Sequence, residues 1–102
     1  MSEPFDLKNH IQYSEGSIVS KTIVDRKSGT LTLFAFDKNQ GLSEHTAPFD
    51  AVIEVLDGEA EITLQAKPVT VSSGQMIIMP ANIPHSLRAI ERFKMLLIMV
   101  RS

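Results

Sequence analysis

Two histidines, His45 and His85, carry the most versatile side-chain chemistry in this 102-residue chain. A neutral imidazole can bind a transition metal, transfer a proton or hydrogen-bond a ligand. His45 lies shortly before the apolar segment 51–56, and His85 directly follows Pro84. The alternation of residues along both segments places the two imidazoles on an inward face. We therefore expect them to converge inside one small β-barrel.

The segment that leads to His85 is predicted to be a stiff corner. Gly74 can take the positive φ of a tight turn, and the apolar run 76–79 is predicted to be a short buried strand. Two prolines then end the strand, because proline has no backbone N–H. Asn82, which lies between them, suits the left-handed backbone region. The corner should deliver His85 to the start of the next strand.

The rest of the chain is typical of short strands joined by turns. Runs of β-branched, aromatic and alternating apolar residues are bounded by turn residues. Asp57-Gly58 lies between two such runs and predicts a β-hairpin. The predicted strands are residues 17–24, 30–36, 51–56, 59–65, 69–71, 76–79 and 93–100. Because no segment has the period of a long helix, we expect one all-β domain, a sandwich or a small barrel.

The two ends of the chain differ from this pattern. Residues 1–16 are polar with scattered apolar positions, and we expect them to form a short N-terminal arm on the domain 17–102. Residues 93–100 form a final strand that is apolar on both faces, although a barrel buries only one face of each strand. Either the arm or a second subunit must cover the other face. Because the apolar residues 95–100 are all bulky, we favour a homodimer.

The composition argues against several classes of function. The net charge is −2 without a basic cluster, which argues against a nucleic-acid partner. The absence of cysteine excludes disulfides, thiolate metal sites and cysteine nucleophiles. The first residues lack the pattern of a signal peptide, and the longest apolar run, 95–100, is too short to span a membrane. We expect a cytoplasmic protein with no membrane partner.

The segments around the two histidines resemble the two motifs of the cupin superfamily, in particular the small single-domain, RmlC-like bacterial cupins. The positions that match the motifs are Gly41, His45, Gly58, Gly74, Pro80 and His85. The motifs cover residues 41–89, and the strand order extends the resemblance to most of the chain after residue 17. The resemblance implies a small jelly-roll β-barrel with a ligand pocket. The residues expected to line that pocket are His45, Ala47, Ala51 and His85.

The chain departs from the cupin motifs at positions that bind metal. Ala47 stands at the second histidine of the first motif, and Ala51 stands at its glutamate. The resemblance therefore implies no more than a weakly held divalent transition metal (zinc, nickel, iron or manganese) on His45 and His85. Asp50 is the remaining candidate for a third metal ligand.

Three functions are compatible with such a pocket. The first is binding of a small molecule, because two alanines in place of ligands make the pocket larger and more apolar. The second is metal-dependent catalysis of the dioxygenase or isomerase type, and the third is a non-catalytic structural or regulatory role. The two histidines would contact a metal or, without one, each other, backbone carbonyls or a buried water. Four methionines are interpreted as core filling: Met76, Met79, Met95 and Met99.

Overall fold

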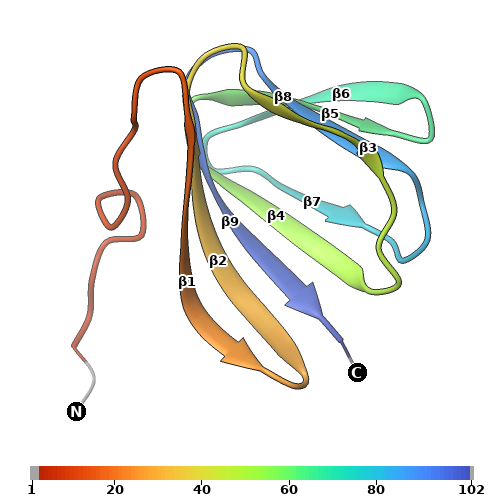
Figure 1. Ribbon diagram of the computed structural model, residues 1–102, viewed down its shortest axis with the longest axis horizontal. Coiled ribbons are helices and arrows are strands. Elements are labelled where there is room, and N and C mark those ends of the chain that lie inside the picture. Colours follow the sequence, from red (N-terminus) through yellow and green to blue (C-terminus); the bar gives the residue numbers. More distant parts are fainter. Residues whose placement is uncertain (1–2, 102) are drawn as a thin grey trace.

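The computed structural model describes residues 3–101, which form strands and turns without a helix (Figure 1). The strands of these residues are β1 (Ile18–Arg26), β2 (Gly29–Phe36), β3 (Gly41–His45), β4 (Asp50–Asp57), β5 (Glu59–Leu64), β6 (Lys67–Ser72), β7 (Met76–Met79), β8 (His85–Ala89) and β9 (Phe93–Val100). The all-β prediction is confirmed. Among the described residues, no helix is long and apolar enough to cross a membrane.

Two antiparallel sheets face each other and form the barrel (Figure 1). One sheet has the strand order β1-β2-β9-β4-β7, and the other has the order β3-β8-β5-β6. The inward side chains of both sheets make the core, where the rings of Phe36 and Phe93 stack with their centroids 4.5 Å apart. Each of these fully buried rings contributes roughly 1.5–3 kcal/mol of hydrophobic stabilisation. This arrangement is the jelly roll that the cupin resemblance implied.

The predicted hairpin at Asp57-Gly58 is wrong. β4 pairs with β7 and β9 in one sheet, whereas β5 pairs with β6 and β8 in the other. Gly58 has a φ of +75° and lies so close to the backbone carbonyl of Arg92 that a side chain would clash there. The Asp-Gly pair therefore makes a corner between the two sheets. A left-handed glycine serves such a corner as well as it serves a hairpin turn, so the local signal did not distinguish them.

The strand before the His85 corner is also not the buried strand that the sequence predicted. β7 lies at the edge of its sheet, and its side chains alternate between solvent and core. Met76 and Ile78 are 57% and 61% exposed, whereas Met79 is only 3% exposed. A run of four apolar residues does not reveal that the strand has a neighbour on one side alone. The turns of the corner agree with the prediction, because Asn82 has a φ of +65°.

The segment before β1 packs on the outer face of the five-stranded sheet as an arm (Figure 1). Ile11 is 4% exposed and is buried against Leu33 and Leu96. The arm therefore supplies part of the cover that the outer face of β9 requires. Farther along the same face, Leu31 and Ile98 stay half-buried.

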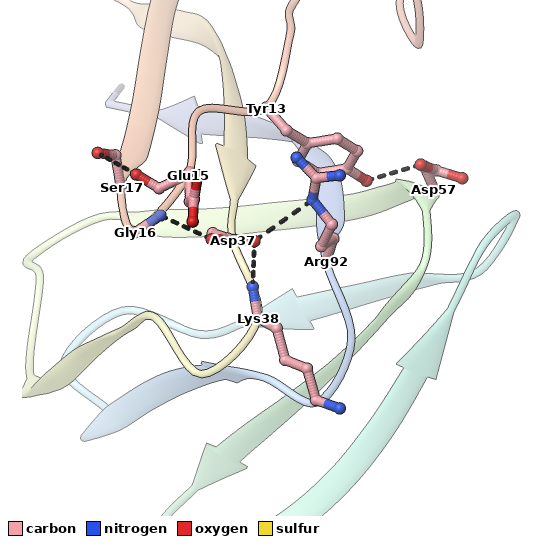
Figure 2. A network of polar contacts seen from close by, with 8 residues as sticks. All are labelled: Tyr13, Glu15, Gly16, Ser17, Asp37, Lys38, Asp57 and Arg92. Atoms are coloured by element: carbon pink, nitrogen blue, oxygen red, sulfur yellow. Dashed lines mark hydrogen bonds and ion pairs between the residues drawn. The ribbon is translucent and has the colours of Figure 1, made fainter.

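A polar clamp centred on Tyr13 fixes the end of the arm (Figure 2). The Tyr13 hydroxyl donates a 2.6 Å hydrogen bond to Oδ2 of Asp57, and the Arg92 guanidinium lies 4.2 Å from the centre of the Tyr13 ring. The buried Lys94 ammonium donates a 2.6 Å hydrogen bond to the backbone carbonyl of Lys8. The hydrogen bond from Tyr13 lowers the pKa of Asp57, while burial and then the same hydrogen bond raise the pKa of Tyr13. We refer to these contacts as the Tyr13 clamp.

We expect Tyr13→Phe to lower the free energy of unfolding by about 1 kcal/mol, a modest value because Asp57 is a third exposed. A lowered pKa of Asp57 stabilises the fold above its unfolded value of about 3.9, and this contribution is lost as the pH falls through the folded pKa. The difference between variant and wild type should therefore shrink between pH 7 and pH 3. Urea denaturation at both pH values measures it. Because phenylalanine keeps the ring, a variant as stable as the wild type at pH 7 would show that ring packing, and not the hydrogen bond, fixes the arm.

Candidate histidine pocket

His45 and His85 meet across neighbouring strands of the four-stranded sheet. His45 ends β3, His85 begins β8, and the two are partners in the antiparallel ladder. Their Nε2 atoms lie 3.1 Å apart, and their rings are inclined at 68°. His85 is 5% exposed and His45 is exposed, so the pair extends from the interior to the surface.

A β-bulge determines that His45 faces inward. The register between β3 and β8 shifts between Leu42 and His45, so β3 contains an extra residue there. Leu42 and His45 both line the cavity between the sheets, although strict alternation would put residues three apart on opposite faces. His45 thus faces inward because of the β-bulge, which the alternation of residues in the sequence does not predict.

Backbone carbonyls fix the tautomers of both histidines. Nδ1 of His45 lies 2.7 Å from the carbonyl oxygen of Ser43, and Nδ1 of His85 lies 3.0 Å from that of Ile83. A carbonyl oxygen only accepts, so both Nδ1 atoms carry hydrogen and donate. In the neutral imidazoles the lone pairs are therefore on the Nε2 atoms, and these face each other at 3.1 Å. Such a contact is favourable when a proton or a metal ion lies between the two nitrogens.

The histidine pair borders a cavity of about 140 Å³ between the two sheets. Apart from the two imidazoles, all of its lining side chains are apolar. The lining consists of Phe34, Leu42, His45, Ala47, Ala51, Ile53, Met79, His85, Leu87, Met95, Leu97 and Met99. The cavity is therefore an apolar chamber with one polar corner, and Ala47 and Ala51 belong to its wall.

Asp50 lies apart from the histidine pair. Its Oδ1 accepts a 2.8 Å hydrogen bond from the backbone N–H of Ala81, and the residue lines a separate surface depression with Pro48 and Val100. Residues 3–101 contain no group of three or more histidine, cysteine, aspartate or glutamate side chains that could hold a metal. The hydrogen bond from Ala81 thus fastens Asp50 to the corner after β7, and His45 and His85 are the side chains of these four types that line the cavity.

The sequence did not single out the walls that the five-stranded sheet contributes. Met95, Leu97 and Met99 alternate on the inner face of β9 and line the cavity. Residues two apart in a strand share a face, so the period-two spacing of these three residues was a usable signal. The pattern did not show that this inner face lies opposite the two histidines.

Comparison with known proteins assigns this arrangement to a family. The family model described as the cupin domain matches residues 32–101, which include both histidine segments. The chain belongs to the cupin family. Among curated proteins, none matches the chain.

Several solved structures are similar to this cupin over all or most of its length. A conserved protein of unknown function from Streptococcus pyogenes, SPY1581, is 38% identical with a TM-score of 0.94, over 100% of this chain and 90% of that chain. A cupin superfamily protein from Desulfitobacterium hafniense is 25% identical with a TM-score of 0.94, over 100% and 94% of the two chains. A cupin 2 conserved barrel domain protein from Leptotrichia buccalis is 43% identical with a TM-score of 0.91; the match covers 94% of this cupin and 47% of that chain, about half its length.

The tautomers can be observed directly. With ¹⁵N-labelled histidine in metal-free protein at pH 8.5, we expect the ring nitrogen shifts of His45 and His85 to show hydrogen on Nδ1, since both are held by carbonyls. His10, whose ring packs at a tilt against Phe5 and is not part of the cavity lining, serves as the internal comparison. Hydrogen on Nε2 with none on Nδ1 in either pocket histidine would contradict this assignment.

Proposed function

We propose that this cupin domain binds a small, largely apolar organic molecule in the cavity beside His45 and His85. The observation that carries the proposal is the apolar chamber with its single polar corner. Its volume of about 140 Å³ is close to that of an engineered cavity of about 150 Å³ that holds benzene, and below the roughly 300 Å³ at which drug-sized pockets begin. The ligand would be the size of one ring or a short chain.

The histidine pair indicates the head group of that ligand. The two facing nitrogens are compatible when a proton or a cation lies between them, and both arrangements are positively charged. A carboxylate or a similar anionic group would be attracted to this corner, while the apolar walls receive the rest of the molecule. We therefore propose small carboxylates with an apolar body as the ligand class.

The same corner would hold a divalent transition metal only weakly. The Nε2 atoms of His45 and His85, 3.1 Å apart, are the two groups that would hold such an ion. Catalytic zinc sites, however, use three protein ligands, and this pocket offers two imidazoles. The facing lone pairs support a second candidate function, a metal-dependent enzyme of the dioxygenase or isomerase type. The missing ligands make it the lesser candidate.

A thermal-shift comparison tests the ligand class. We expect benzoate or hexanoate to raise the melting temperature more than the matched neutral compounds benzyl alcohol and hexanol. A ligand at 100 times its Kd stabilises the fold by about 2.7 kcal/mol, which raises the melting temperature by roughly 10–20 °C for a domain of this size. Ala47→Leu should abolish the shift by filling the cavity from its partly exposed rim.

Thr46→Leu is the matched control for this experiment, because Thr46 is exposed and is not part of the lining. That variant should keep the shift of the wild type. An equal response to neutral and anionic compounds would contradict the role of the histidine corner. A shift that survives Ala47→Leu would show that the ligand binds elsewhere.

A second copy of the chain is the partner that we propose for the outer face of the five-stranded sheet. Five apolar side chains, one from each strand, form a continuous row in register: Val24, Leu31, Ile98, Val52 and Ile78. The arm covers the neighbouring row at Leu96 and leaves this row half-buried or exposed. A two-fold axis along the row would stack it on itself and keep the two arms at opposite ends.

We expect light scattering to report a dimer for the wild type and a monomer for Ile98→Glu, because a charge in the centre of the row would be desolvated in the dimer. Val69→Glu is the control, since Val69 is 43% exposed but belongs to the other sheet. Circular dichroism establishes that both variants are folded. A folded Ile98→Glu protein that remains dimeric would place the interface elsewhere.

A further inference from the structure

The donors around the histidine pair do not form the site of a hard divalent metal. Ala47 and Ala51 occupy the positions at which the cupin motif has an imidazole and a carboxylate. In the part of the chain that the structure describes, no third histidine, cysteine, aspartate or glutamate joins the pair. A metal on the two Nε2 atoms would therefore receive no anionic side-chain ligand from this cavity.

The residues on either side of Ala51 carry thioethers instead. Ala51 pairs with Met79 of β7 and with Met99 of β9, so the two methionines flank it across the sheet. Both side chains line the same cavity as His45 and His85. A thioether is a neutral, soft and polarizable donor. Flexible thioether side chains therefore lie on both sides of Ala51, the position at which the cupin motif has a carboxylate.

Neutral donors in an apolar chamber select the charge of an ion. The free energy of removing an ion from water grows with the square of its charge. It is therefore about four times as large for a divalent ion as for a monovalent ion of equal size. Without a carboxylate, a divalent ion would keep its full charge inside the barrel. Cu(I) carries a single charge, accepts low coordination numbers, and is the ion that imidazole and thioether donors suit together.

We propose that the cavity binds one Cu(I) ion through the Nε2 atoms of His45 and His85 and the sulfur of Met79 or Met99. The proposal rests on the proposed pocket function, because both use the same histidine pair. It assigns a binding role to methionines that the sequence alone presents as core filling. It also gives the pocket a preference for a soft monovalent ion over zinc, nickel, iron or manganese.

Anaerobic titration of the metal-free protein with Cu(I), in competition with bicinchoninate, tests the proposal. We expect one Cu(I) per chain and a sulfur scatterer in the X-ray absorption spectrum of the copper. Leu conserves the volume of Met, so Met79→Leu/Met99→Leu should keep the fold while losing the sulfur scatterer. Its Cu(I) affinity should fall by at least roughly tenfold, the scale on which changes around a metal act. Met76→Leu is the matched control, because Met76 is 57% exposed and outside the cavity lining.

The outcomes separate this inference from the proposed function. An unchanged Cu(I) affinity in the double methionine variant would overturn thioether ligation. Tighter binding of Zn(II) than of Cu(I), or a lack of Cu(I) binding, would overturn the choice of ion. If benzoate still raises the melting temperature in these cases, the pocket function stands without the copper. If neither copper nor a carboxylate binds, both proposals fail.

Discussion

The pairing of β3 with β8 is the constraint on which the rest of the pocket depends. It places His45 opposite His85, while a carbonyl two residues earlier holds each Nδ1. Two local hydrogen bonds thereby decide which nitrogen of each ring carries hydrogen and which faces the other histidine. A slip of one residue between these strands would turn one imidazole to the other face of the sheet. The donor pair therefore exists in this one register.

Much of the fold could be predicted from the sequence, because periods and turns are local. The alternating strands and the left-handed Asn82 follow from side-chain pattern and backbone preference alone. The corner at Gly58 did not follow, since Asp-Gly suits both a hairpin and a sheet-to-sheet corner, and distant contacts with Arg92 select the corner. The exposure of Ile78 did not follow either, because edge position is a property of the whole sheet.

The site was predictable in its residue types but not in its geometry. Motif spacing identified His45 and His85, yet the inward direction of His45 depends on a bulge in β3 that the spacing does not encode. Met79 lies in the segment that leads to His85, whereas Met99 lies in the final strand. The pairing of β4 with β7 and β9, which the sequence does not encode locally, brings both beside Ala51. With alanine at positions 47 and 51, the lining of the cavity is apolar apart from the two imidazoles, within the same jelly-roll barrel.

β9 connects the pocket with the Tyr13 clamp. Lys94 holds the arm on the outer face, and its neighbour Met95 lines the cavity on the inner face. A shift of β9 would therefore move side chains that contact the arm and side chains that line the cavity. Thermodynamic linkage then requires reciprocity. If a ligand in the cavity raises the equilibrium constant for docking of the arm, the docked arm raises the affinity for that ligand by the same factor. Such coupling would make the arm a contributor to the affinity of the cavity, although the arm lies on the far side of the sheet.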